Sequence, residues 1–150
     1  MSLKRHPALQ PFSRDHLIGL FHAQRLIKLA ENSSRAALTA AMEEFGGAWH
    51  REISVHFADE DRILAPLPLS GISLQKLEED HDEITKLVQK LLQQPSQPLA
   101  VRVGTLLDAH IRWEEHELFP EVETTLTMDA LELLAEKTVA IENARHRTLT

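Results

Sequence analysis

Apolar residues recur along this chain at alternating spacings of three and four, and a histidine repeatedly takes one of the apolar positions. The clearest stripe lies within residues 73–93 and consists of Leu74, Leu77, His81, Ile84, Val88 and Leu91. Because residues three and four apart share one side of an α-helix, this segment is predicted to be an amphipathic helix whose buried face includes His81. Any fold that packs this face must also accommodate a buried imidazole.

Three further segments carry histidines in the same way, over about residues 13–31, 35–64 and 98–118. Their stripes are His16, Leu20, Ala23 and Ile27; Phe45, Trp49, His56, Glu60 and Ile63; and Val103, Leu107, His110, Glu114 and Leu118. Each of the four predicted helices therefore places one histidine on its apolar face, and two of them add a glutamate.

Helix-breaking and helix-capping residues divide the chain into these segments. Ser13, Ser73 and Thr127 are the predicted N-caps of the first, third and fifth helices. The Gly46-Gly47 pair is expected to weaken or kink the second helix. Pro120 is expected to end the fourth helix, since proline interrupts helical hydrogen bonding.

Four helices of about 20 residues joined by short loops predict an all-α protein, an up-down antiparallel four-helix bundle over about residues 13–120. Tyrosine is absent and β-branched residues are scattered, which leaves little from which to build strands. A shorter fifth helix is predicted over about residues 127–145, as an appendage or part of an interface. We interpret residues 1–150 as a single domain.

Composition excludes several classes of function. A net charge of −7 argues against a nucleic-acid partner, and the absence of cysteine excludes thiolate metal sites and thiol redox chemistry. No apolar run approaches the roughly 18 residues of a membrane span, so no membrane partner is expected. The first residues lack the apolar run and cleavage site of a signal peptide. A soluble, cytoplasmic protein is expected.

Two of the helical segments repeat one motif. Both His56…Glu60 and His110…Glu114 read His-x-x-x-Glu, and a proline follows each histidine by ten residues. Residues i and i+4 lie one turn apart on one helix face, so their side chains converge. An imidazole and a carboxylate brought together in this way suit a first-row metal ion. Asp15-His16 and Asp80-His81 repeat in the other two helices, which indicates two related helix pairs.

Each histidine taken alone has a simpler interpretation, as a core residue with a hydrogen-bonded ring. We apply that interpretation to five of the nine histidines, which lie off the stripes: His6, His22, His50, His116 and His146. For the stripe residues it fails, because without metal the bundle would bury two carboxylates among histidine and leucine. Such carboxylates, Glu60 and Glu114, are expected to be hard to ionise in the metal-free protein.

The motifs together resemble the hemerythrin-like (HHE) cation-binding domain. The matching stretches are Arg14-Asp-His16-Leu, His56-Phe-Ala-Asp-Glu60, Glu79-Asp-His81-Asp-Glu and His110-Ile-Arg-Trp-Glu114-Glu-His-Glu-Leu-Phe-Pro120. The resemblance implies a four-helix bundle that holds a non-haem di-iron centre able to bind or react with dioxygen. It implies ligand roles for His16, His56, Glu60, His81 and His110, and for one carboxylate after His110.

The sequence departs from the oxygen-carrying members at two points. Those proteins have five histidines and two carboxylates, with two histidines one turn apart on the third helix, where Leu77 and Thr85 flank His81 here. They also place the last carboxylate five residues after the histidine, which corresponds to Glu115. The internal repeat favours Glu114, so both glutamates are candidate ligands, with Glu114 ranked first.

Three functions follow as alternatives. The first is binding or sensing of dioxygen, nitric oxide, redox state or iron itself, by two iron ions, although zinc or manganese also suits such ligands. The second is a di-iron oxidase or peroxidase. The third is a metal-free interaction bundle, which would not need the buried histidines and glutamates. A homodimer or a protein partner is compatible with each alternative.

Overall fold

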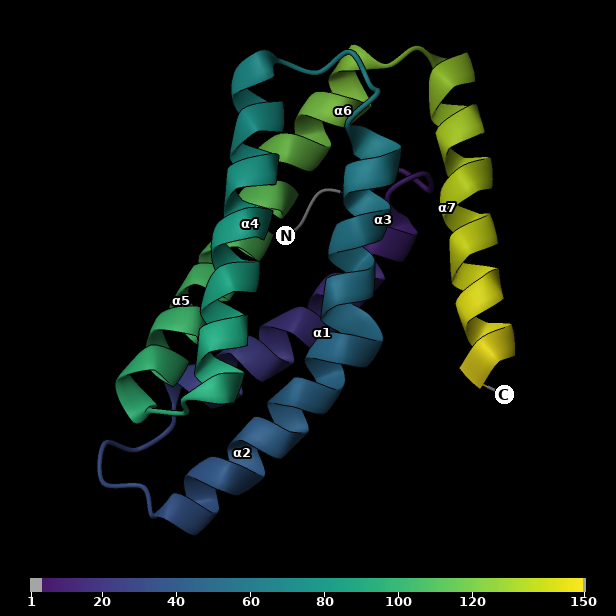
Figure 1. Ribbon diagram of the computed structural model, residues 1–150. Coiled ribbons are helices and arrows are strands. Elements are labelled where there is room, and N and C mark those ends of the chain that lie inside the picture. Colours follow the sequence, from purple (N-terminus) through teal and green to yellow (C-terminus); the bar gives the residue numbers. More distant parts are fainter. Residues whose placement is uncertain (1–3, 150) are drawn as a thin grey trace.

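The computed structural model describes residues 4–149, with side chains through residue 145, and this part of the chain is all helical, as predicted (Figure 1). The elements in chain order are α1 (Gln10–Ile27), α2 (Arg35–Ala48), the π-helical segment η1 (Trp49–Ile53), α3 (Ser54–Leu64), α4 (Gly71–Gln93), α5 (Gln97–Trp113), the π-helical segment η2 (Glu114–Leu118), α6 (Phe119–Thr125) and α7 (Met128–Leu149). None of the helices in the described part combines the length and the apolarity needed to cross a lipid bilayer.

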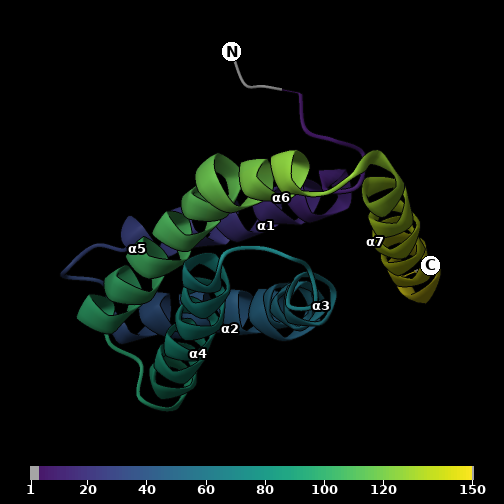
Figure 2. The same ribbon diagram turned by 90° about the horizontal axis from the view of Figure 1, so that it is seen from above.

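Four long rods make up most of the molecule. α2, η1 and α3 follow one another without a break and form one rod, and α5, η2 and α6 form another. The remaining two rods are α1 and α4. α1 contacts α5 on one side and α2, η1 and α3 on the other, while α4 contacts α3 and α5, so the four rods enclose a shared interior (Figures 1 and 2). α7 contacts α1 and lies outside this group.

Several helix boundaries differ from the predicted ones. α1 begins at Gln10, with Pro11 in its first turn, and not after Ser13. Ser70, not Ser73, caps α4, and its hydroxyl accepts a hydrogen bond from the Ser73 amide. The prediction for Thr127 is confirmed, since its hydroxyl accepts from the Ala130 amide at 3.2 Å. α7 continues to Leu149, beyond the predicted end at about 145.

Pro120 does not end the fourth rod, contrary to the prediction. It lies in the first turn of α6, and the chain remains helical to Thr125. In an α-helix the proline ring would clash with the carbonyl four residues earlier. Here the preceding turn is the wider π-helical segment η2, which absorbs that clash without breaking the rod. The Gly46-Gly47 pair likewise leaves α2 helical, and the irregular turn begins after it, at Trp49.

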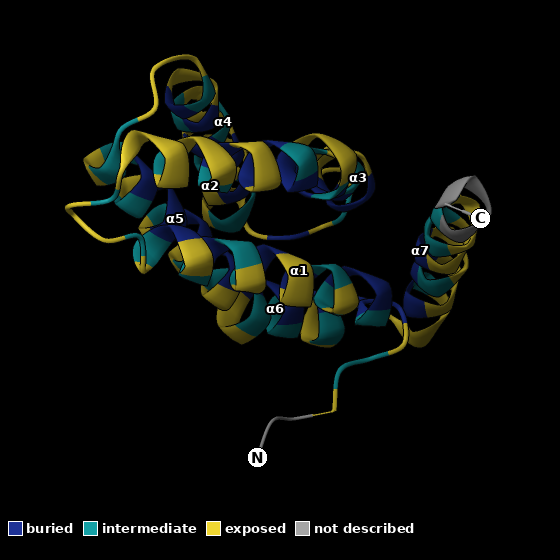
Figure 3. Cartoon of the chain, turned by 90° about the horizontal axis from the view of Figure 1, so that it is seen from below, coloured by how far each residue is buried: buried dark blue, intermediate teal, exposed yellow. Residues whose placement is uncertain are grey.

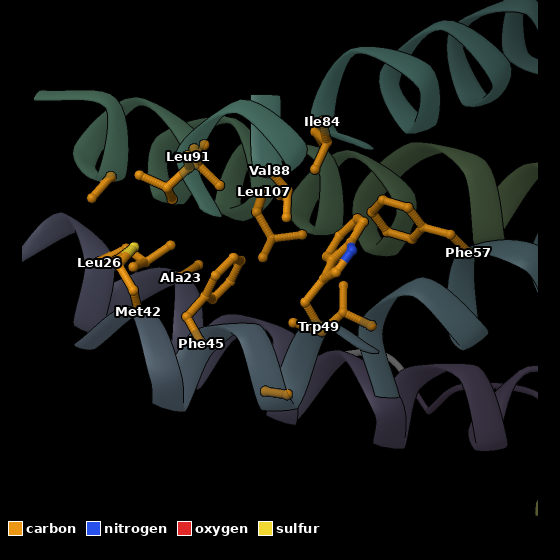
Figure 4. Close-up of a cluster of buried hydrophobic side chains, with 14 of the residues drawn as sticks. Ala23, Leu26, Met42, Phe45, Trp49, Phe57, Ile84, Val88, Leu91 and Leu107 are labelled. Atoms are coloured by element: carbon orange, nitrogen blue, oxygen red, sulfur yellow. The ribbon is translucent and has the colours of Figure 1, made fainter. Parts of the chain in front are cut away.

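The buried residues, which are coloured dark blue in Figure 3, include two apolar clusters. One cluster, drawn in Figure 4, includes Ala23, Ile53, Phe57, Ile84 and Leu107. The other includes Phe12, Ile63, Leu77, Leu118 and Phe119. On each rod the stripe histidine lies between a residue of one cluster and a residue of the other. A polar layer therefore crosses the interior between two apolar ones.

Glycine lets α1 and α5 approach closely beside this layer. A Cβ atom added to Gly104 would lie 2.6 Å from the backbone oxygen of Ala23 and 3.0 Å from side-chain atoms of Leu26 and Ile27. Because a backbone oxygen cannot swing aside as a side chain can, the two helices would have to separate. The spacing of these rods is therefore set at Gly104.

We expect Gly104→Ala to destabilise the fold, although alanine favours helix by about 1 kcal/mol over glycine. The steric cost of overpacking is about 1–3 kcal/mol, so the urea midpoint of unfolding should fall. The control is Gly46→Ala, also inside a helix, where the added Cβ would lie 3.4 Å from the end of the Leu92 side chain. That variant should be neutral or more stable. Equal stabilisation of both variants would show that the α1–α5 contact is not tight.

Candidate metal centre

Six ionisable side chains make up the polar layer between the apolar clusters. Each rod contributes one histidine, and the two rods with π-helical segments also contribute one glutamate each. Their exposed fractions are at most 5%: His16 2%, His56 5%, Glu60 0%, His81 4%, His110 2% and Glu114 0%. These are the residues that the stripes and the His-x-x-x-Glu motifs singled out.

The six side chains form two groups that share their carboxylates. His16 and His56 make one group with Glu60 and Glu114, and His81 and His110 make a second group with the same two glutamates. Within each group the potential ligand atoms lie within 4.8 Å of one another. Each group, with two imidazoles and two shared carboxylates, could hold a metal ion.

The Nε2 atoms of the histidines all point toward these carboxylates. The Nε2 atom of His56 lies 3.1 Å from Glu60, and that of His110 lies 2.8 Å from Glu114, across one helical turn in both cases. His81 reaches Glu60 from another rod at 3.2 Å. His16 lies between the glutamates, 3.7 Å from Glu60 and 3.5 Å from Glu114.

The opposite ring nitrogen of every one of these histidines meets a carboxylate. The Nδ1 pairs are His16 with Glu115 at 2.5 Å, His56 with Asp15 at 2.9 Å, His81 with Asp61 at 2.8 Å and His110 with Asp80 at 2.9 Å. An ionised carboxylate only accepts hydrogen bonds, so Nδ1–H donates to it. The neutral ring then carries its lone pair on Nε2, directed into the polar layer. Metal-binding histidines typically have such partners.

The four partner carboxylates follow a simple rule in the sequence. Each is the immediate neighbour of one of the six buried residues: Asp15 precedes His16, Asp80 precedes His81, Asp61 follows Glu60 and Glu115 follows Glu114. The two aspartates before histidines orient rings within their own half of the repeat. The carboxylates after glutamates cross between halves. The repeated Asp-His pairs are visible in the sequence, but their role in orienting histidine rings was not predicted. The signal for that role is the acidic residue next to His16, His81, Glu60 and Glu114.

Aromatic rings hold the imidazole planes. The ring of His81 stacks on Phe57, with centroids 4.0 Å apart and 11° between planes. The ring of His16 stacks on Phe119 at 5.3 Å and 9°. Phe12 meets His56 edge-on. Ring contacts and Nδ1 hydrogen bonds together leave the imidazoles little rotational freedom.

Cations outside the layer hold three of the partner carboxylates. Arg145 of α7 bonds to Asp15 at 2.8 Å and to Asp59 at 2.6 Å. Lys76 lies 3.0 Å from Asp80. Arg5 binds the backbone oxygen of Glu115 at 2.7 Å and approaches its carboxylate at 3.4 Å. Arg5, before α1, and Arg145, in α7, thereby connect both ends of the described chain to carboxylates of the site.

The buried atoms that face one another across the layer have no hydrogen-bond partners in the described part of the chain. They are Nε2 of His16, His56, His81 and His110, and both carboxylate oxygens of Glu60 and Glu114. A fully buried polar atom without a partner is costly. All eight atoms are good ligands for a divalent first-row metal ion, so the residues fit such ions.

In the metal-free protein, protonated imidazoles compensate the negative charge of the buried carboxylates. Burial lowers the pKa of His56, but the Glu60 charge and the bond to Asp15 raise it to about 9. Burial likewise opposes the effect of Asp61 and Glu60 on His81, whose pKa rises to about 10. Burial also lowers the pKa values of His16 and His110, but both are raised overall, by Glu114 together with Glu115 and Glu60 at His16 and with Asp80 at His110.

The expectation that Glu60 is hard to ionise is wrong for this arrangement. Burial raises the pKa of its carboxyl group, but the nearby His56 and His16 lower it well below the ordinary value. The sequence-based argument treated the carboxylate as unpaired. In the structure the surrounding rings take up protons more readily than the carboxylate does.

The remaining candidates lie away from the two groups. Glu115 belongs to neither group, and its carboxylate bonds to His16 Nδ1 and to the Ser13 hydroxyl. His22 is half-buried, with Nδ1 4.0 Å from Glu44, and His50 and His116 are exposed. His6 accepts a hydrogen bond from the Ala8 amide. The side chain of His146 lies outside the described residues.

The positions one turn from His81 are occupied as the sequence indicates. Leu77 is 2% exposed and belongs to the apolar cluster that includes Phe12. Thr85 is half-buried on the other side of His81. Among the described residues, no fifth histidine joins the two groups.

Comparison with known protein families agrees with this geometry. The family described as the hemerythrin HHE cation binding domain matches residues 15–122. The chain belongs to this family. The match begins at Asp15 and includes all six buried residues, while Arg5 and α7 lie outside it. No curated protein and no solved structure matches the chain significantly.

The raised histidine pKa values predict proton release on metal binding in this HHE domain. His56 and His81, with pKa values of about 9 and about 10, are protonated at neutral pH without metal. An imidazole must lose its extra proton to bind metal, so zinc loading at neutral pH should release at least about two protons, one each from His56 and His81, with a further contribution from His16 and His110. Calorimetry in buffers of different ionisation enthalpy measures this number. Zinc binding without proton release would contradict the site.

The same shifts set the pH dependence of the metal-free protein. A raised histidine pKa stabilises the fold below the unfolded value, and this contribution is lost as pH rises through the folded value. Urea midpoints of metal-free protein should therefore fall as pH rises through about 9 and about 10. The apparent affinity for metal should rise over the same pH range, because fewer of the histidines then need to lose a proton before they bind the ion.

Proposed function

We propose that this HHE domain is an up-down four-helix bundle that binds two metal ions, preferentially iron, to bind or sense a small ligand such as dioxygen or nitric oxide. The observation that carries the proposal is the pair of buried groups sharing Glu60 and Glu114. His16 and His56 would hold one ion, and His81 and His110 the other. Both glutamates would reach both ions.

Two iron ions held by these residues would supply a redox-active centre with positions left for a small ligand. The chain's own part is to present the ligands and keep water out. The four carboxylate partners keep protons on Nδ1 and direct the Nε2 lone pairs inward. The apolar clusters on either side of the layer keep bulk water from entering along the rods. Zinc or manganese would also suit this donor set, and family membership favours iron.

Binding or sensing is favoured over turnover, because the described site contains ligands and ring-orienting carboxylates but no additional acid or nucleophile directed into it. One observation supports an oxidase or peroxidase as the second candidate. His16 and His56 form part of the wall of a cavity, which would bring a molecule larger than a diatomic gas beside two of the proposed ligands.

The ligand roles of Glu114 and Glu115 are separable by substitution. Wild-type protein reconstituted with ferrous iron without oxygen should retain two ions per chain after dialysis. Glu114→Gln should retain at most one, because it removes a carboxylate common to both groups. Glu115→Gln should retain two, with faster loss to a chelator, because it disturbs only the orientation of His16.

Elemental analysis with circular dichroism of each variant measures the outcome, and unchanged helicity excludes a folding defect. Retention of two ions by Glu114→Gln together with loss by Glu115→Gln would assign the ligand role to the second glutamate. One ion in the wild-type protein would contradict the dinuclear proposal.

The number of ligands predicts how the reduced protein treats dioxygen. Six side chains are available for two ions, against seven in the five-histidine oxygen carriers, so each ion would keep an open position. Ferrous protein mixed with dioxygen should be oxidised, and removal of dioxygen should not restore the ferrous form. Stopped-flow absorbance followed by deoxygenation tests this expectation. Full recovery of the ferrous spectrum would instead indicate reversible oxygen carriage.

A further inference from the structure

A cavity of about 540 Å³ lies between α1, α3 and α7 and borders the polar layer. The buried His16 and His56 form part of its wall, and residues of η1 and α5 complete it. A small molecule such as water takes up only about 30 Å³. The cavity is therefore far larger than a diatomic gas requires, and it has the size of sites that bind organic ligands.

Most of the wall surface is apolar. It is formed by Ile18, Ile53, Phe57, Leu107, Ile111 and Ile141, among others. The lining runs from the surface to the interior, since Ile18 is 36% exposed while Ile53 is 5% and Ile111 3% exposed. A ligand entering here would exchange water for hydrocarbon contacts over most of its surface.

The charged residues of the lining compensate one another. They are three arginines and four carboxylates: Arg51, Arg62, Arg145, Asp15, Glu52, Asp59 and Glu142. Arg145 bonds to Asp15 and Asp59, and Arg62 lies 3.2 Å from Asp59. Glu142 forms a salt bridge with Arg14, which does not line the cavity. The arginines and carboxylates of the lining thus differ by a single charge, which leaves no large excess of one sign to select an ionic ligand.

We propose that this cavity binds a neutral, mainly apolar organic molecule beside the His16–His56 half of the polar layer. Its outer wall comes from α7, through Ile141 and Arg145, and α7 lies outside the family match over residues 15–122. The site is thus completed by a part of the chain that the family match does not include. Apolar burial supplies the affinity, and the absence of a large excess of charge sets the preference for neutral ligands.

The proposal does not depend on the metal centre being dinuclear or containing iron. The walls are formed by side chains that fold around the cavity in the structure as it stands, and zinc keeps the protein diamagnetic. We therefore design the test for both metal-free and zinc-loaded full-length protein. Failure of metal binding and failure of ligand binding are then separate results.

Isoleucine methyl groups provide a built-in reporter. Of the eight isoleucines, four line the cavity, namely Ile18, Ile53, Ile111 and Ile141, and four lie elsewhere, namely Ile27, Ile63, Ile72 and Ile84. Indole is neutral and apolar, and its ring current shifts nearby methyl signals. In protein with labelled isoleucine δ1 methyls, added indole should shift the first four signals with a common saturation curve and leave the other four unchanged.

Two further titrations test whether indole binding is specific to the cavity and to a neutral ligand. Indole-3-acetate has the same ring with a negative charge, and it should bind more weakly than indole. Ile18→Trp places a large side chain at the half-open rim and should abolish the saturable shifts. The matched control is Ile72→Trp, at a position that is 83% exposed and outside the cavity, and it should bind indole as wild type does.

Three results would overturn the proposal. One is indole producing no saturable shift of the four cavity methyls in wild-type protein. Another is shifts of all eight isoleucines alike, which would indicate non-specific association. The third is tighter binding of indole-3-acetate than of indole, which would assign an anionic ligand class to the cavity. Because the wild-type titration alone can produce each of these results, a misfolded Ile18→Trp variant leaves the test intact.

Discussion

The structure depends on burying four imidazoles and two carboxylates in one layer between apolar clusters. Such a layer is tolerable only if each group has a compensating partner. The chain supplies half of the compensation itself, through a carboxylate on the Nδ1 atom of each histidine. The other half faces inward as eight atoms without partners. These atoms are suited to bind metal ions. Without metal, the imidazoles take up protons and so compensate the negative charge of the glutamates.

The same hydrogen bonds tie the two halves of the repeat together. Asp61 follows Glu60 but orients His81 on another rod, and Glu115 orients His16 in the reverse direction. A carboxylate that belongs to one half thereby fixes a ring that belongs to the other. Displacing either rod with a π-helical segment would disturb ring orientation in both groups, because Asp61 and Glu115 lie on these rods. The packing of the rods and the geometry of the site are therefore coupled. The close approach at Gly104 contributes to this coupling, because that glycine sets the separation of two of the four rods.

The sequence predicted which residues are buried better than it predicted where helices begin and end. The stripes place His16, His56, His81 and His110 on helix faces because periodicity alone decides which face is apolar. The neighbours of those faces depend on how the rods pack, and periodicity carries no information about that. Asp61 illustrates the limit, since its side chain is 51% exposed and reads as an ordinary surface acid, yet it orients His81. Pro120 failed as a helix end for a related reason, because the π-helical turn before it has no clear local pattern.

The two groups are alike in their ligands and unlike in their surroundings. In the half with His16 and His56, Asp15 is covered by Arg145, and an apolar cavity with α7 in its wall borders both rings. In the half with His81, the partner Asp61 is open to solvent. A repeat generates matched pairs of residues, and a segment outside the repeat can add differences between them. α7 is such a segment, so part of the asymmetry of the site comes from beyond the family match. If two metal ions bind as proposed, the chemistry at the two positions would differ through access and water exclusion, although each position has two histidines and shares the two glutamates.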